Sequence, residues 1–134
     1  MTKRDICLAA VAAMKNSYSP YSHFTVGAAL LTKSGKLYTG CNIENSAFGP
    51  TVCAERVAVF KAVSEGEVEF EMFAVVGGKN GIVEGVTSPC GVCRQVLSEF
   101  CAGDLRIVMG TPDKITVSTL KEILPYSFGK SNLS

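Results

Sequence analysis

Three cysteines and one glutamate are spaced along the chain in a pattern that suits a metal centre. Glu55 lies two residues after Cys53, and Cys90 and Cys93 follow with a Cys-x-x-Cys spacing. Three thiolates can occupy three corners of the tetrahedron that Zn²⁺ prefers and leave the fourth to water, which is the arrangement of a catalytic site. Glu55 can then move protons at that water without binding the ion. The pattern predicts that Cys53, Cys90 and Cys93 bind zinc and that Glu55 is the proton shuttle.

Arg56 directly follows the expected proton shuttle and brings a positive charge to the expected metal centre. Three thiolates give the zinc unit a formal charge of minus one, which weakens the effect of the ion on a bound water. A hydrogen bond from Arg56 to a ligand sulfur would offset this charge. This contact is a hypothesis about the electrostatics of the site.

The Cys-x-x-Cys pair taken alone is also typical of redox centres and of structural zinc sites. A redox role would leave Cys53 and Glu55 without a purpose. A closed structural site would need a fourth ligand, which Cys7, Cys41 or Cys101 would have to supply. Cys7 and Cys101 fall on expected helices and are interpreted as small buried residues, and Cys41 as a strand residue. A zinc-stabilised binding or redox module is therefore the rival from another class.

Apolar periodicity and turn residues predict helices and strands in the order αββαβαββα. Helices are expected over 6–13, 53–63, 88–101 and 119–125, strands over 24–31, 37–42, 70–76, 105–109 and 115–117, and a glycine-rich loop over 79–87. Ser88 and Pro89 are typical of a helix start, with the serine as cap and the proline as first residue. Thr119 and Glu122 have the spacing of a capping box.

Strands that alternate with helices favour an α/β domain. We expect a largely parallel sheet covered on both faces, with an antiparallel hairpin at one edge. In such folds the helices that begin near Cys53 and Cys90 start at the same edge of the sheet, where α/β proteins form their sites. Unpaired N–H groups at a helix start also favour the thiolate that a metal needs.

Length and composition indicate one domain over residues 1–134. The chain is 47% apolar and only 19% charged, which hints at a surface covered by copies of itself. A net charge of +1 without any basic run makes nucleic acid a poor partner. No stretch resembles a secretion signal or a membrane span, so we expect no membrane partner and a cytoplasmic location. In reducing surroundings the six cysteines would bind metal or react rather than pair.

Several motifs, taken together and in order, resemble the small cytidine deaminases that bind zinc through three cysteines. The likeness spans nearly the whole chain and includes Tyr18-Ser19-Pro20-Tyr21-Ser22, Gly40-Cys41-Asn42-Ile43-Glu44-Asn45, Cys53-Ala54-Glu55-Arg56, Pro89-Cys90-Gly91 and Cys93-Arg94-Gln95. The resemblance implies a three-layer α/β/α fold with a five-stranded mixed sheet. It also implies Zn²⁺ as cofactor and the hydrolytic deamination of cytidine and 2'-deoxycytidine in pyrimidine salvage. The alternative within this class is a related deaminase of another aminopyrimidine nucleoside.

The resemblance also implies substrate contacts and an assembly. Asn42 and Glu44 match residues that hydrogen-bond the ribose 3'-hydroxyl, and Phe24 matches a residue beside the sugar and base. The backbone at Ala54, with that near Ser88, would contact the pyrimidine edge. Relatives of this length form homotetramers in which a phenylalanine near the C-terminus reaches a neighbour's pocket, and Phe128 is the match.

Overall fold

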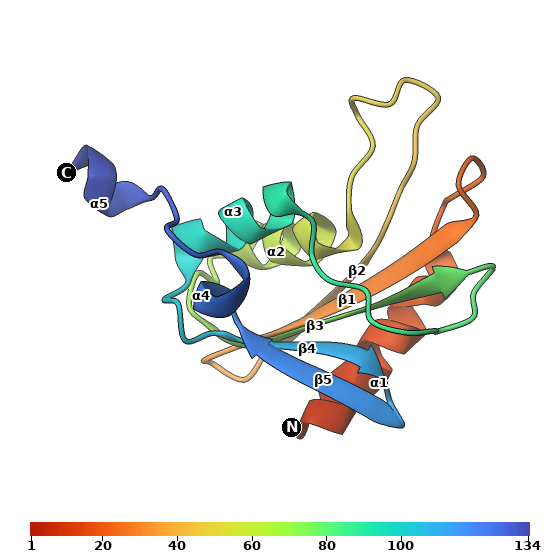
Figure 1. Ribbon diagram of the computed structural model, residues 1–134, viewed down its shortest axis with the longest axis horizontal. Helices are drawn as coiled ribbons and strands as arrows, with labels where there is room; N and C mark the ends of the chain where they lie inside the picture. Colours follow the sequence, from red (N-terminus) through yellow and green to blue (C-terminus); the bar gives the residue numbers. More distant parts are fainter.

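The computed structural model describes all 134 residues as a sheet with helices on both faces (Figure 1). The amino-terminal half contains α1 (Lys3–Ala13), a 3-10 turn η1 (Met14–Asn16), β1 (Phe24–Thr32), β2 (Leu37–Cys41) and α2 (Ala54–Ser64). The second half contains β3 (Phe70–Lys79), α3 (Gly91–Phe100), β4 (Arg106–Thr111), β5 (Lys114–Thr119), α4 (Leu120–Ile123) and α5 (Lys130–Leu133). The expected order of elements is thus confirmed, and α5 is the one helix that the sequence pattern did not predict.

The five strands form a mixed sheet in the order β2-β1-β3-β4-β5. Only β3 and β4 are parallel neighbours, whereas β1 is antiparallel to both β2 and β3 and β5 is antiparallel to β4. The expectation of a largely parallel sheet is therefore wrong, because β1 inserts between β2 and β3. The mixed three-layer fold that the resemblance implied is confirmed. Since β2 and β3 both oppose β1, they run in the same direction, and α2 and α3, which follow them, begin at the same edge.

Two apolar cores lie on opposite faces of the sheet. One face packs against α1 through Ile6, Cys7 and Ala10, and the other packs against α2, α3 and α4 through residues such as Val59, Leu97 and Leu120. Alternate residues of β1 and β3 point to opposite faces and so contribute to both cores. The two layers of helices are visible on either side of the strands in Figure 1.

A glycine in β2 lets α2 approach the sheet closely. A Cβ atom placed on Gly40 would lie 2.5 Å from the carbonyl oxygen of Ala54 and 2.7 Å from the amide nitrogen of Ala58. No side chain tolerates contacts of this length. Gly40 therefore sets how deeply the first turn of α2 sits on the sheet.

The start of α3 differs from the expectation. Cys90, in an extended conformation with φ −67° and ψ 168°, is the residue before the first helical residue, Gly91. Ser88 and Pro89 lie outside the helix, and the hydroxyl of Ser88 accepts a hydrogen bond from the side chain of Arg94. Cys90 therefore lies at the start of α3, just as Cys53 lies at the start of α2.

Local caps define the short elements. The carboxylate of Glu122 accepts a hydrogen bond of 2.8 Å from the backbone N–H of Thr119, which confirms the predicted capping box at α4.

β3 runs three residues further than predicted, to Lys79, because Gly77 and Gly78 continue the pairing with β1. No helix has the length and apolar character needed to cross a bilayer.

Candidate metal centre

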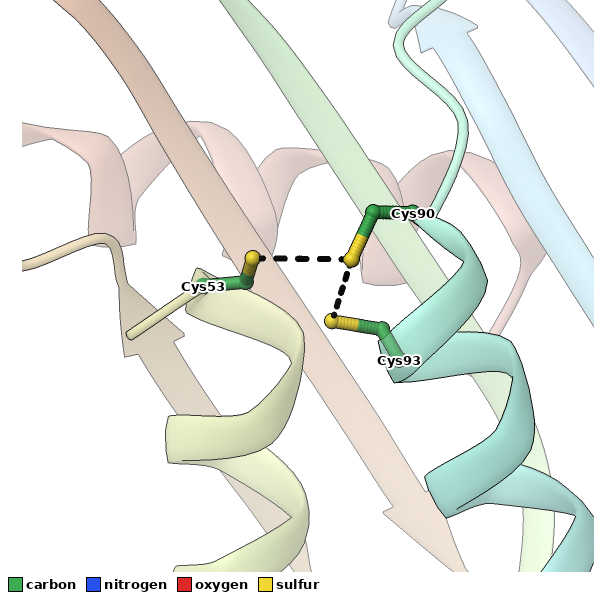
Figure 2. Close-up of side chains that lie close together, drawn as sticks. All are labelled: Cys53, Cys90 and Cys93. Atoms are coloured by element: carbon green, nitrogen blue, oxygen red, sulfur yellow. Dashed lines mark hydrogen bonds between the residues drawn. The ribbon is translucent and has the colours of Figure 1, made fainter. Parts of the chain in front are cut away.

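Three cysteine side chains meet between the first turns of α2 and α3. The Sγ atom of Cys90 lies 3.7 Å from that of Cys53 and 3.3 Å from that of Cys93. All three sulfurs lie within 4.8 Å of one another, and none is in a disulfide. Figure 2 shows the side chains converging from two neighbouring helices on one point. The structure thus brings together the three residues that the sequence pattern selected.

The spacing of the sulfurs suits a tetrahedral zinc ion. With a Zn–S bond of about 2.3 Å, two ligands at a tetrahedral angle lie about 3.8 Å apart. The 3.7 Å between Cys53 and Cys90 agrees with this value, and Cys93 needs only a small side-chain adjustment from 3.3 Å. No fourth cysteine, histidine or carboxylate belongs to the cluster. The donor set is therefore that of an open zinc site rather than a closed structural one.

The groups around the three cysteines favour negative charge on Cys53. Hydrogen bonds from the thiol of Cys93, from the guanidinium of Arg56 and from Cys90 lower the pKa of Cys53 to about 5. The pKa of Cys93 is raised because its proton is held by Cys53 and because the residue is buried. The Nη2 atom of Arg56 lies 3.6 Å from the Sγ of Cys53, which is the contact that the sequence hypothesis required. A thiolate ready to bind a cation is therefore built into the protein.

Glu55 lies on the first turn of α2, beside the cysteines. Only 4% of its surface is exposed, so the sheet and the neighbouring helix exclude water from most of the carboxyl group. Burial, with a further contribution from the nearby charge of Cys53, raises the pKa of Glu55 above its ordinary value. A raised pKa makes this carboxyl group a better proton acceptor than an ordinary glutamate, which suits a group that must take up a proton and return it.

The Asn42 to Glu44 segment is joined directly to Val52, the residue before Cys53. Ile43 and Val52 exchange two backbone hydrogen bonds of 3.0 Å in an antiparallel bridge. Because Ile43 is the residue between Asn42 and Glu44, and Val52 precedes Cys53, this bridge brings the polar pair next to the metal centre. The sequence pattern gave no sign of this bridge, since it joins two isolated residues outside the sheet.

The side chains of Asn42 and Glu44 are held by the first residues of β1 and by the segment that precedes it. The Oδ1 atom of Asn42 accepts hydrogen bonds from the N–H of Val26 and the hydroxyl of Ser17, and its Nδ2 donates to the carbonyl of Phe24. The Glu44 carboxylate accepts from the backbone N–H of Tyr21 and from the N–H and hydroxyl of Ser22.

These contacts leave part of each group free. One N–H of the Asn42 amide and one of the four lone pairs of the Glu44 carboxylate have no partner among these bonds. Sequence reasoning missed Ser17 and Ser22, although both belong to the serine-rich run before β1. Glu44 also lines an open cleft of about 400 Å³ whose walls include Tyr21 and Phe48.

The remaining predicted contact residues lie in different surroundings. Phe24 begins β1, and its ring lies against Gly77, where an added Cβ would be 3.0 Å from the ring edge. Ala54 is fully buried as the first residue of α2. Phe128 lies apart from the cluster, on a tail that runs along α3, with 60% of its surface exposed. The structure therefore does not bring Phe128 together with the cysteines of its own chain.

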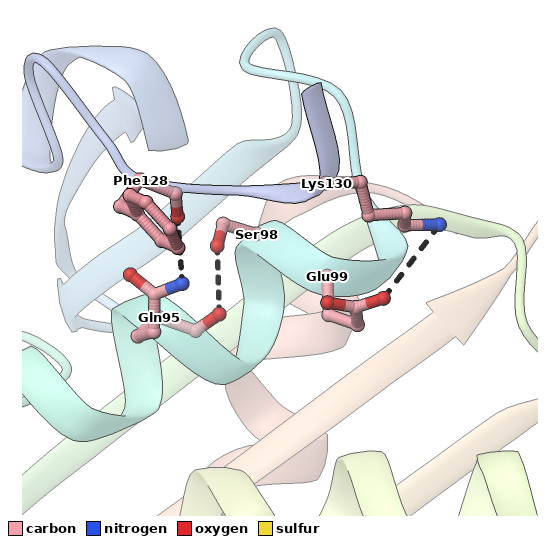
Figure 3. Close-up of polar contacts among 5 residues, drawn as sticks. All are labelled: Gln95, Ser98, Glu99, Phe128 and Lys130. Carbon is pink, nitrogen blue, oxygen red and sulfur yellow. Dashed lines mark hydrogen bonds and ion pairs between the residues drawn. The ribbon is translucent and has the colours of Figure 1, made fainter. Parts of the chain in front are cut away.

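The tail that carries Phe128 is attached to α3 by polar contacts. The Nε2 atom of Gln95 donates a hydrogen bond of 2.8 Å to the carbonyl of Phe128, and Lys130 pairs with Glu99 at 3.7 Å. Figure 3 shows both contacts on one side of α3, with the phenyl ring free of them. The backbone is thus held while the aromatic side chain remains exposed.

The other cysteines lie away from the centre. Cys7, a residue of α1, is fully buried, as expected, and Cys41 is a residue of β2. Cys101 is only partly buried, although burial, with a smaller effect of Asp104, raises the pKa of its thiol to about 12. His23 is exposed and takes a left-handed conformation with φ 57°. None of these residues contributes to the group of metal-binding candidates.

Comparisons with known proteins agree with this geometry. A family model described as the cytidine and deoxycytidylate deaminase zinc-binding region matches residues 1–111. A cytidine deaminase from Sporosarcina psychrophila is 49% identical over 91% of this chain and 88% of its own length. One from Halalkalibacterium halodurans is 41% identical over 100% of this chain and 99% of its own. The crystal structure of cytidine deaminase from Burkholderia pseudomallei superposes with a TM-score of 0.87 at 41% identity, covering 96% of this chain and all of the other.

Proposed function

The chain belongs to the cytidine and deoxycytidylate deaminase family, and we propose that it hydrolyses the 4-amino group of free cytidine and 2'-deoxycytidine. The products are uridine or 2'-deoxyuridine and ammonia, as in pyrimidine salvage. The observation that carries the proposal is the cluster of Cys53, Cys90 and Cys93 beside a buried Glu55. The catalytic unit would comprise residues 1–134 as one domain.

The ion and the carboxyl group divide the chemistry between them. Zinc held by the three sulfurs would supply an acidified water as the nucleophile. Glu55 takes the proton released as oxygen adds to C4 of the pyrimidine and delivers it to N3. Glu55 then assists the proton transfer to the amino group as the C4–N bond breaks and ammonia leaves. Its burial and raised pKa suit this double role, because the carboxyl group must carry the proton between the two steps.

The sugar would be read by the groups that remain free on two side chains. The free N–H of Asn42 can donate to the ribose 3'-hydroxyl, and the free lone pair of Glu44 can accept from it. This pair favours a free nucleoside, because an internal nucleotide of RNA or DNA has its 3'-oxygen esterified. Phe24 would lie beside the sugar and base, and the backbone of Ala54 would contact the pyrimidine edge.

The assembly proposed with this function is a homotetramer with shared sites. α2 has apolar residues around its whole circumference, yet Phe60 on its outer side is 49% exposed. Helices of this kind are usually covered on both sides. The exposed ring of Phe128 on its anchored tail would reach the site of a neighbouring chain. The six unpaired cysteines suit the reducing cytoplasm, which we propose as the location.

The experiment that tests the function compares Glu55→Gln with the unsubstituted protein. Cytidine hydrolysis is followed by the loss of absorbance in the cytosine band and by ammonia release, and zinc is measured by elemental analysis. We expect Glu55→Gln to retain zinc and to lose turnover, since an amide cannot carry the proton. Glu69→Gln, on the surface, is the matched control and should stay active. A fully active Glu55→Gln protein, or purified parent protein without zinc, would contradict the proposal.

A further inference from the structure

Arg94 connects the loop before α3 to the end of α4. Its Nε donates a hydrogen bond of 2.7 Å to the carbonyl of Pro89, and its Nη2 donates one of 3.2 Å to the hydroxyl of Ser88. On the other side, Nη1 donates at 2.7 Å to the carbonyl of Ile123, the last residue of α4. All three guanidinium nitrogens therefore have a protein acceptor. A lysine could not make this planar, three-way set of bonds, since its donors share a single nitrogen.

The loop that Arg94 holds has little other support. Residues 85–89 make no backbone–backbone hydrogen bond with any part of the chain. The side-chain hydrogen bonds that reach Ser88 and Pro89 both come from Arg94. Pro89 is fully buried, so without Arg94 its carbonyl would lose its partner in a place where that loss is costly. Apart from the packing of Pro89, the hydrogen bonds that hold Ser88 and Pro89 therefore come from a single side chain.

The same loop helps to place one sulfur of the cluster, together with the hydrogen bond of 2.9 Å that the backbone N–H of Arg94 donates to the carbonyl of Cys90. Cys93 is inside α3 and is fixed by the helix, whereas Cys90 precedes the first helical residue and is exposed. Its backbone follows directly from the two residues that Arg94 holds. The bond to Ile123 fixes the guanidinium from the opposite side, so that the loop is tied to α4 as well as to α3.

We propose that Arg94 is a positioning residue of the metal centre. Its guanidinium keeps the Ser88–Cys90 segment where the Cys90 sulfur lies 3.7 Å from that of Cys53. The inference rests on the proposed function, because it takes the three sulfurs to be zinc ligands. Groups that orient metal ligands typically change metal affinity by about 10- to 100-fold when they are removed.

The test measures zinc release from the purified, zinc-loaded protein into a chromogenic chelator. The variants are Arg94→Gln and Arg94→Lys. Arg94→Gln removes the two outer guanidinium nitrogens, Nη1 and Nη2, whereas Arg94→Lys keeps the positive charge but not the planar set of three donor nitrogens. Arg106→Gln is the matched control, because Arg106 lies on the surface and pairs only loosely with Glu71, at 3.8 Å. Folding of each protein is checked by circular dichroism in excess zinc, and kcat and KM for cytidine are measured under the same conditions.

We expect both Arg94 variants to release zinc about 10- to 100-fold faster than the parent while remaining folded in excess zinc, and Arg106→Gln to match the parent. Zinc release at the parent rate in Arg94→Gln would overturn the inference. Parent-like release in Arg94→Lys would overturn it too, because charge alone would then suffice. If Arg94→Gln does not fold, Arg94→Lys decides the matter. A parent protein without zinc or activity would instead refute the proposed function, so the two failures are distinguishable.

Discussion

The guanidinium Nη2 of Arg56 lies 3.6 Å from the Sγ of Cys53, one turn along the same helix. The hydrogen bond from Cys93, together with this contact and a smaller effect of Cys90, lowers the pKa of the Cys53 thiol to about 5. The Nε atom of the same guanidinium is buried and has no partner of its own. Arg56 therefore places a fixed positive charge beside Cys53, one expected ligand of the metal.

Arg56→Gln should weaken zinc binding by about 10- to 100-fold, because the Cys53 thiolate loses its charged donor. Loss of that donor raises the pKa of Cys53, so protons compete with zinc more strongly as the pH falls. The difference between variant and parent should therefore be larger at pH 6 than at pH 8. Competition with a chromogenic chelator at several pH values measures it. Equal affinities for variant and parent at every pH would remove Arg56 from the electrostatic account.

Gly40→Ala should lower both stability and turnover. The added Cβ would lie 2.5 Å from the carbonyl oxygen of Ala54, so α2 must move outward with Cys53 and Glu55. Overpacking of this kind costs about 1–3 kcal/mol of unfolding free energy. Urea unfolding and cytidine turnover are the measurements. Gly49→Ala is the control, since nothing lies within 4 Å of a Cβ there, and a Gly40→Ala protein as stable as this control would contradict the close packing.

Cys101 should resist alkylation although it is partly exposed. Burial raises the pKa of its thiol to about 12, so at pH 8 only about one molecule in 10⁴ carries the thiolate that reacts. Its reactivity should rise about tenfold with each pH unit above 8. Peptide mapping of the zinc-loaded protein after iodoacetamide treatment checks this, with the urea-unfolded chain as reference. Equal rates in folded and unfolded protein at pH 8 would show that the thiol is not protected.

Phe128→Ala should lower kcat/KM by about tenfold, the effect of losing a packed aromatic contact worth about 1.4 kcal/mol. Co-expression with Glu55→Gln then tests whose site the ring serves. If Phe128 acts in a neighbour, mixed oligomers contain some sites with both Glu55 and Phe128 intact. Their activity should exceed the sum of the two variants purified alone. Activity no greater than that sum would place the ring in its own chain's site or in none.

The metal centre could be predicted from the sequence because the residues that indicate it lie close together in the chain at each of the two helix starts. Cysteine and glutamate spacings at two helix starts depend on one turn of helix each, and the structure brings those residues together. Apart from the contact of Arg56 with Cys53, the supporting contacts could not be predicted, since Ser17 and Ser22 act on residues more than 20 positions away and Arg94 reaches 29 positions to Ile123. Such contacts depend on tertiary packing, for which residue types alone carry no spacing signal.

The elements were predicted better than their pairing. Periodicity located each strand and the four main helices, but it could not show that β1 inserts between β2 and β3 and makes the sheet mixed. Alternation of strand and helix describes the chain order, whereas the pairing depends on tertiary packing, which places the β1–β2 hairpin with β1 against β3. The predicted cap at Ser88 was also wrong. The serine hydroxyl instead accepts a hydrogen bond from the side chain of Arg94.

The division of the sheet into two separate cores has a practical consequence. All three cysteines and Glu55 lie on the side of α2 and α3, whereas α1 covers the opposite side with a core of its own. Lys3 and Lys15, at the two ends of that covering segment, are exposed. Lys3 lies at the start of α1, on the face of the sheet opposite the cysteines, so attachment to beads or an electrode at this one position leaves the side of α2 and α3 turned toward the solution.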